Sequence, residues 1–230
     1  MQLTFHGHSC VSLSLPSGSL PDAGGVLVID PGTFSDTAAA LVRAAAVLIT
    51  HDHPDHVDVP VVAGFLSSAP HAQLWGTAPV VEALRAGGAP EHQVHEARPG
   101  TVLDIAGVRV TVGGGDHALI HPDVPRAANV TYLVEAGGRS LFHPGDSYEA
   151  PTELPESGLN VLLVPVAGPW MKTQEAIDFA RSVPAGVVVP IHDAPLSEIG
   201  HALAGRWLDT ARLGGDYTYT RLTAGESLEV

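Results

Sequence analysis

Cysteine, aromatic residues and positive charge are all scarce in this chain of 230 residues. The one cysteine, Cys10, excludes an intramolecular disulfide and fits a reducing compartment. It lies in the alternating stretch 9–15, which predicts a small buried thiol rather than a nucleophile. Aromatic residues make up 5% of the chain, so valine, leucine and alanine must fill the core.

Basic residues number 11 against 25 acidic ones, which gives a formal net charge of −14. Such a surface repels polyanions and anionic membranes, so we expect neither a nucleic-acid nor a membrane partner. No apolar run is long enough to cross a bilayer, and residues 1–5 lack the features of a secretion signal. We expect a cytoplasmic protein whose partner is a small-molecule substrate. The sequence leaves a homo-oligomeric assembly open.

Neither a repeat nor a linker divides the chain, so we expect one domain over residues 1–230. Strand signals come first, and a helix–strand alternation then occurs twice. Two sheets packed face to face with helices outside would satisfy that order, which predicts an α/β fold of four layers, αββα. Strands are expected at 3–6, 10–15, 25–29, 47–50, 73–75, 129–135, 139–142, 160–164, 186–191 and 217–222, a hairpin over 101–112, and helices at 35–46, 58–67, 79–86, 173–182 and 197–213.

The segment HDHPDH at residues 51–56 is the most informative part of the sequence. It directly follows an apolar strand signal and offers four potential metal ligands. In an extended backbone His51 and His53 point the same way. The proline that follows stiffens the turn, so that Asp55 and His56 can face a different point. One short loop can therefore serve two neighbouring ions, and nitrogen and oxygen ligands suit zinc, manganese or iron.

Three further candidates, His117, Asp146 and His192, each follow the end of a later strand signal. Each has an ordinary alternative when taken alone. His117 would suit a solvated turn, Asp146 a turn or helix cap, and His192 a hydrogen-bonded strand end. Their order and their strand positions together favour metal ligands. Asp30 is interpreted differently, as a residue that holds the histidine loop through hydrogen bonds without touching metal.

The ordered set His51-x-His53-x-Asp55-His56, His117, Asp146 and His192 resembles the metallo-β-lactamase superfamily. Within that superfamily it is similar to the bacterial metal-dependent hydrolases related to ascorbate-6-phosphate lactonase. The resemblance runs over residues 3–192, and it is far more specific for fold and metal site than for substrate. Shorter matches support the same branch: Gly7-His8-Ser9, Ile29-Asp30-Pro31, His143-Pro144-Gly145-Asp146 and Pro190-Ile191-His192.

The resemblance implies the metallo-β-lactamase fold and a site for two divalent metal ions. Zinc is the expected metal, with manganese or iron as alternatives. Two ions about 3.5–4 Å apart can share a hydroxide that is nucleophilic at neutral pH. Asp55 is the expected catalytic residue, since it could accept or relay the proton. The implied ligands are His51, His53 and His117 for one ion, Asp55, His56 and His192 for the other, and Asp146 as the bridge.

Clues to the substrate are few. Trp170 and Lys172 lie in the segment before the helix 173–182, where Trp170 could stack on a ring and Lys172 could pair with an anion. The alternatives are a packing anchor and a solvated cation. His8 is expected either to line the pocket and orient a ligand or to be a buried, hydrogen-bonded histidine.

These observations predict a metal-dependent hydrolase in which a hydroxide between two zinc ions attacks a small ester, lactone or phosphodiester. The first alternative is a di-iron oxidoreductase, because some relatives host redox chemistry on this scaffold. Those relatives usually carry a carboxylate where this chain has His56, which disfavours that alternative. The second is a non-catalytic small-molecule-binding protein on the same fold, and the complete ligand set argues against it.

Overall fold

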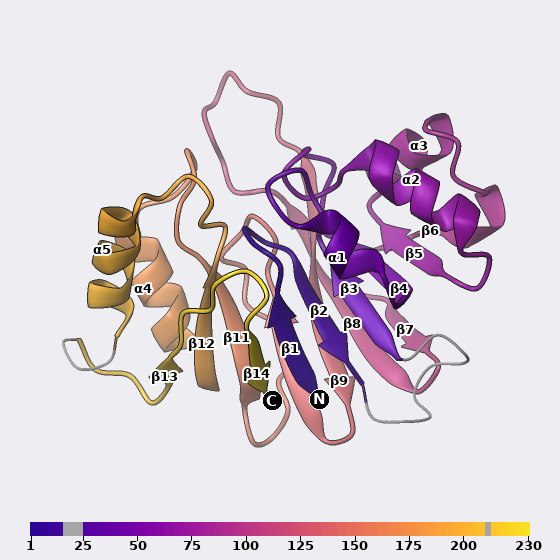
Figure 1. Ribbon diagram of the computed structural model, residues 1–230. Coiled ribbons are helices and arrows are strands. Elements are labelled where there is room, and N and C mark those ends of the chain that lie inside the picture. The colour runs from indigo at the N-terminus through magenta and orange to yellow at the C-terminus, as the bar shows by residue number, and fades with distance from the viewer. Residues whose placement is uncertain (16–24, 210–212) are drawn as a thin grey trace.

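Two sheets of seven strands each form the centre of the computed structural model, which describes residues 1–15, 25–209 and 213–230 (Figure 1). The first sheet has the order β14-β1-β2-β3-β4-β5-β6, and the second has the order β13-β12-β11-β10-β9-β8-β7. The strands of the first sheet are β1 (Gln2–Phe5), β2 (Val11–Ser14), β3 (Val26–Ile29), β4 (Ala44–Ile49), β5 (Gln73–Gly76), β6 (Val94–Glu96) and β14 (Ser227–Glu229). Those of the second are β7 (Val102–Ile105), β8 (Val108–Asp116), β9 (Ala128–Ala136), β10 (Arg139–His143), β11 (Leu159–Pro165), β12 (Ala185–Ile191) and β13 (Thr218–Tyr219).

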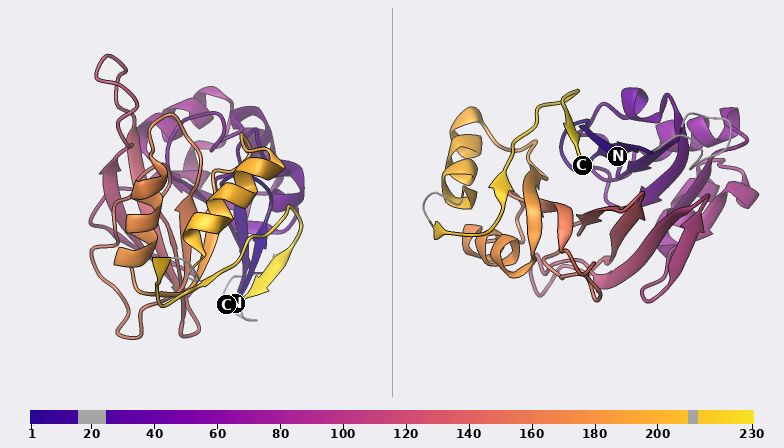
Figure 2. Two further views of the ribbon diagram at one scale, coloured as in Figure 1. Left: turned by 90° about the vertical axis from the view of Figure 1, so that its left-hand side faces the viewer. Right: turned by 90° about the horizontal axis from the view of Figure 1, so that it is seen from below.

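Helices cover the outer face of each sheet (Figures 1 and 2). The first sheet is covered by α1 (Thr37–Leu41), α2 (Val59–Ser68) and α3 (Ala78–Ala86), with the short 3-10 helix η1 (Glu91–Gln93) leading into β6. The second is covered by α4 (Thr173–Ser182) and α5 (Glu198–Leu208). None of the helices in the described residues is long and apolar enough to cross a membrane. The four predicted layers, αββα, are confirmed.

The largest core lies between the two sheets and is built from residues that alternate along the strands. Leu3 and Phe5 of β1 face it, as do Val108, Val110 and Val112 of β8. A spacing of two places these side chains on one face of each sheet, since successive strand residues point to opposite sides. Two smaller cores fill the spaces between each sheet and its helices. Aliphatic side chains dominate all three, as the low aromatic content predicted.

Strand direction determines where the polar residues gather. β3, β4 and β5 are parallel, as are β10, β11 and β12. β1 also runs parallel to β3, because both are antiparallel to β2, and β8 runs parallel to β10 through β9. Carboxyl ends of strands that run the same way meet at one edge of a sheet. The segments that follow β1, β3, β4, β8, β10 and β12 therefore emerge at shared edges.

The helix expected over residues 35–46 is wrong in its second half. α1 ends at Leu41, and Ala44 and Ala46 belong to β4, where they pair with Val26 and Leu27 of β3. An alanine-rich segment favours a helix by itself, but pairing between two buried strands outweighs that weak preference.

The C-terminal predictions were also only partly right. α5 ends at Leu208 instead of Leu213, and residues 210–212 lie outside the described residues. The strand expected over 217–222 is reduced to β13. Cys10 is fully buried, and burial raises the pKa of its thiol well above the ordinary value, which agrees with a packing role.

Tyr132 connects the two sheets by a buried hydrogen bond. Its ring comes from β9 of the second sheet, and its hydroxyl donates to the carbonyl oxygen of Ile49, in β4 of the first sheet, at 2.9 Å. Burial raises the pKa of this phenol well above its usual value, so that it stays a donor throughout the neutral range.

We expect Tyr132→Phe to lower the free energy of unfolding by about 1 kcal/mol, because it removes this bond and leaves the ring in place. Urea denaturation would measure the change as a lower midpoint at constant slope. Tyr217→Phe is the matched control, because this residue is only half-buried and its hydroxyl, which donates to the carbonyl of Leu208 at 2.7 Å, should contribute less. An unchanged midpoint in Tyr132→Phe would contradict the role of this bond in joining the sheets.

Candidate metal centre

Histidine and aspartate side chains from both sheets converge where the carboxyl ends of the strands meet. They form two groups, and within each group the potential ligand atoms lie within 4.8 Å of one another. The seven residues predicted from the sequence as ligands all lie in these groups, and His8 joins them. The groups are His51, His53, His117 and Asp146, and His8, Asp55, His56 and His192.

Short connections position these side chains. The histidine loop, residues 51–56, follows β4 and lies just before α2. Asp58 caps that helix by accepting from the backbone N–H of Val61 at 3.2 Å. Gly32, in the segment that follows β3, packs directly against the histidine loop. A Cβ there would lie only 1.9 Å from the carbonyl oxygen of Asp55, so this close approach requires glycine.

Asp146 lies between the two groups, and it is 2% exposed. Its Oδ1 is 3.1 Å from Nε2 of His56, and its Oδ2 is 3.2 Å from Nε2 of His117 and 3.0 Å from Nε2 of His192. His117 belongs to the first group, whereas His56 and His192 belong to the second. This carboxylate therefore lies where a ligand shared by two ions would be needed.

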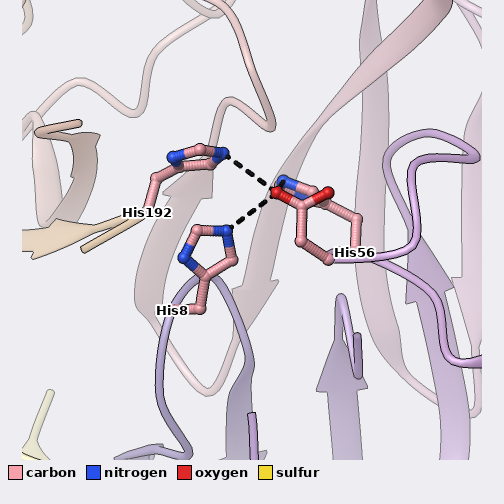
Figure 3. Close-up of side chains that lie close together, drawn as sticks. His8, His56 and His192 are labelled. Carbon is pink, nitrogen blue, oxygen red and sulfur yellow. Dashed lines mark hydrogen bonds and ion pairs between the residues drawn. The ribbon is translucent and has the colours of Figure 1, made fainter. Parts of the chain in front are cut away.

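Asp55 is the second carboxylate and is more accessible than Asp146. Its Oδ2 lies 3.1 Å from Nε2 of His8 and 3.4 Å from Nε2 of His192 (Figure 3). The backbone N–H of Ala194 points at Nδ1 of His8 at 3.3 Å, which makes that nitrogen an acceptor. Nε2 of His8 must then carry the hydrogen and donate it to Asp55. In this arrangement His8 orients Asp55, a contact that fits both alternatives expected for it, a buried hydrogen-bonded histidine and one that orients a ligand.

Several buried atoms that face this centre have no hydrogen bond of normal geometry. They include Nε2 of His56, His117 and His192 and Oδ1 of Asp146. Buried polar atoms without a partner lower stability, and a native fold rarely concentrates them in one place. Cations bound between these atoms would satisfy them together, and imidazole nitrogens with carboxylate oxygens are suitable ligands for zinc, manganese or iron. The residues therefore fit a pair of divalent metal ions.

Asp30 holds the histidine loop, as the sequence predicted. It is completely buried; its Oδ2 lies 2.7 Å from Nδ1 of His56 and accepts from the Thr50 hydroxyl at 2.7 Å. Its Oδ1 accepts from the backbone N–H of Thr50 at 2.8 Å. The Nδ1–H of His117 similarly donates to the carbonyl of Ala118 at 2.6 Å. These bonds leave Nε2 of both rings free to face the centre.

Trp170 is adjacent to the centre, but its indole is buried. Its Nε1–H donates to Oδ2 of Asp146 at 3.1 Å, and its ring lies edge-on to His117 and His192. This contact orients Asp146 and was not foreseen from the sequence. Lys172 is exposed at the start of α4. Stacking on a substrate by Trp170 and anion binding by Lys172 stay predictions.

The backbone around the centre adopts an unusual conformation at three positions. His8, Asp30 and His192 have φ angles of 55°, 51° and 56°, in the left-handed region that residues other than glycine seldom occupy. Such conformations cost about 1–3 kcal/mol each and concentrate at functional sites. The backbone N–H of His192 donates to the carbonyl of His8 at 2.8 Å, which holds two of these residues together.

A family model described as a beta-lactamase superfamily domain matches residues 2–192. The chain belongs to the metallo-β-lactamase superfamily. Protein Rv0786c of Mycobacterium tuberculosis is 40% identical over 197 residues, which cover 84% of each protein. Probable L-ascorbate-6-phosphate lactonase UlaG of Salmonella heidelberg is 28% identical over 123 residues, or 47% of this chain and 35% of that protein.

Solved structures show the same fold. Igni18, a metallo hydrolase from the archaeon Ignicoccus hospitalis, superposes with a TM-score of 0.69 at 19% identity, covering 99% of this chain and 97% of that one. CmlA, a diiron β-hydroxylase from Streptomyces venezuelae, superposes with a TM-score of 0.71 at 18% identity, covering 100% of this chain and 54% of that one. One fold thus carries both hydrolytic and oxidative chemistry, and the fold alone does not decide between them.

The buried histidines of the candidate metal centre differ in the direction of their pKa shifts. Burial opposes the charged form of His192, but the close carboxylates of Asp146 and Asp55 outweigh it and raise the pKa of His192 to about 9. His56, buried as well, has a pKa well above its ordinary value because of Asp146 and Asp30. Burial and the neighbouring His56 instead lower the pKa of His51 well below its ordinary value. Without metal, the second group therefore holds protons at neutral pH.

We expect divalent metal ions to displace those protons, because only a neutral imidazole nitrogen can bind a metal ion. The apparent affinity of the chelator-treated protein should rise with pH toward about 9, by about tenfold per pH unit for each proton released. Calorimetry of zinc binding at pH 7, in two buffers of different ionisation enthalpy, would count the protons. Binding without proton release would contradict the charge assigned to His192 and His56.

We expect Asp30→Asn to lower metal affinity by about 10–100-fold, because it removes the charge that orients the His56 ring. Competition with a chromogenic chelator would measure the affinity, and circular dichroism would confirm the fold. Asp104→Asn is the matched control, since this exposed carboxylate accepts from the Gly107 N–H in the β7–β8 hairpin. Equal affinities in the two variants would show that Asp30 has no part in metal binding.

Proposed function

We propose that the protein is a dinuclear metal-dependent hydrolase that acts on a small ester, lactone or phosphodiester. The observation that carries this proposal is the position of the Asp146 carboxylate, which is in contact with imidazoles of both ligand groups. Membership of the superfamily and the likeness to Igni18 support it. We propose zinc as the native metal because the ligand groups are rich in imidazole, with manganese or iron as alternatives.

The protein's own side chains would divide the work at the centre. Two bound divalent cations would supply a nucleophile from water at neutral pH and polarise the oxygen of the scissile group. His51, His53 and His117 would hold one cation, Asp55, His56 and His192 the other, and Asp146 both. Asp55 is the proposed proton acceptor, because its side chain is 22% exposed and therefore reachable from solvent. His8 would keep its carboxylate oriented.

A di-iron oxidoreductase is the second candidate, and the likeness to CmlA is the observation that favours it. In such an oxidoreductase, His56 would have to be a ligand of the second iron ion. Iron in the purified protein, together with a visible absorption band that depends on oxygen, would favour this candidate over the hydrolase. A cytoplasmic location and a homo-oligomeric state stay predictions.

We expect about two equivalents of zinc, manganese or iron per chain by plasma mass spectrometry, on protein purified without a chelator or histidine tag. A metal content that stays well below two equivalents per chain, even after zinc, manganese or iron has been added, would contradict the dinuclear site.

We expect His51→Ala and Asp146→Ala to reduce hydrolysis by more than about 100-fold, the upper range for residues that only support a ligand. Panels of esters, lactones and phosphodiesters would provide the substrates, and a chelator should abolish turnover until metal is restored. His71→Ala is the matched control, because this exposed histidine lies between α2 and β5. Unimpaired turnover in the first two variants would rule out the proposed mechanism.

A further inference from the structure

The loop between β8 and β9, residues 117–127, carries an exposed apolar surface. It rises from the top of the molecule in Figure 1. Leu119 is 54% exposed, Ile120 36% and Val124 42%. A group of large apolar side chains on one exposed segment is unusual for a folded protein and often marks a binding site.

This loop is attached directly to the metal centre. It begins at His117, and Arg126 near its other end donates to the carbonyl of His117 and forms an ion pair with Asp116 at 3.1 Å. A small concavity is lined by loop residues that include Leu119, Ile120 and Val124, together with His53 and His117. The apolar side chains therefore share one surface with two proposed metal ligands.

A further apolar side chain lies next to the other ligand group. Phe34 is 56% exposed, and its ring contacts that of His8 edge-on, with 5.3 Å between centroids. His8 in turn contacts Asp55. Each of the two ligand groups thus has apolar surface beside it.

Apart from the cations proposed at the centre, the charges beside the apolar loop disfavour an anionic substrate group. Arg126 is already engaged by Asp116 and by the carbonyl of His117. Asp52, in the histidine loop, and Asp123, in the apolar loop with its Oδ2 3.6 Å from Nδ1 of His121, are both exposed carboxylates. They add to the net charge of −14. A phosphate group would meet carboxylates here, whereas a neutral apolar group would cover exposed hydrocarbon.

We propose that Phe34, Leu119, Ile120 and Val124 form the apolar walls of the substrate site, and that the substrate is an ester or lactone with a neutral aliphatic or aromatic group. This inference rests on the proposed function, because the apolar group must carry the bond that is cleaved. Water adds to the acyl carbon and the C–O bond breaks, which yields a carboxylate, an alcohol and one proton. The substrate differs in kind from the phosphorylated lactone for which UlaG is named.

Binding of alkyl hydroxamates to the metal-loaded protein tests the walls without requiring turnover. The hydroxamate head group chelates metal, and its alkyl chain probes the surface beside it. Calorimetry should show octanohydroxamate binding at least about 30-fold more tightly than acetohydroxamate, since each fully buried CH₂ contributes about fourfold. The double variant Leu119→Ser/Val124→Ser should reduce this ratio by about tenfold, and Phe34→Ser should reduce it separately.

Ile199→Ser is the matched control, because Ile199 is an apolar residue that is 75% exposed on α5. It should leave the ratio unchanged. The substituted wall residues are exposed in the same way, so their variants should fold, and thermal denaturation would confirm it.

Equal affinities for the two hydroxamates, no binding of either, or a wall variant that behaves like Ile199→Ser would overturn the proposal. Tighter binding of inorganic phosphate than of octanohydroxamate, weakened by Lys172→Ala, would also overturn it in favour of an anionic substrate. Hydrolysis of p-nitrophenyl octanoate, p-nitrophenyl acetate and bis(p-nitrophenyl) phosphate is measured in parallel. A chain-length effect that the wall variants abolish, with no hydrolysis of any substrate class, would support the apolar walls and refute the proposed hydrolase.

Discussion

A single buried carboxylate, that of Asp146, is the interaction on which the rest of the site depends. It follows β10 of the second sheet, and it meets His56 from a loop of the first sheet as well as His117 and His192 from its own. A buried anion is costly unless opposite charge and hydrogen bonds surround it. The imidazoles and the indole N–H of Trp170 provide these, and bound cations would complete them. The two sheets must therefore stay in one relative position for the site to exist.

Rigid surroundings maintain this arrangement. Asp30 holds both Thr50 and the ring of His56, so the turn after β3 determines the position of the loop after β4. The left-handed conformations at His8, Asp30 and His192 persist because hydrogen bonds and buried neighbours over-determine them. The candidate ligands lie at or close to strand ends, which is an arrangement that can hold metal ligands in a fixed geometry.

The proposed reaction and the proposed choice of substrate depend on different parts of the structure. The converging imidazoles and carboxylates favour metal-assisted chemistry, which the superfamily uses for hydrolysis and, in the fold of CmlA, for diiron hydroxylation. The β8–β9 loop and Phe34 present hydrocarbon at the rim of the same centre. Metal identity would decide the reaction class, whereas the rim would select the substrate. If so, a specific metal motif would say little about the substrate.

By itself, the sequence determined the two-sheet architecture and the role of Asp30 in holding the histidine loop, and it predicted the ligand types, because the spacing of residues 51–56 and the alternation of apolar residues are local patterns. It also predicted that His117, Asp146 and His192 would join them, though only through their order and strand positions, and the structure brings all three into the two groups. Tertiary structure alone decided that Ala44 and Ala46 pair in β4, that Trp170 donates to Asp146, that His8 orients Asp55, and that Leu119 and Val124 border the metal centre. Each of these contacts joins residues brought together only when the strands align in their sheets and the sheets pack, and no local pattern encodes such distances.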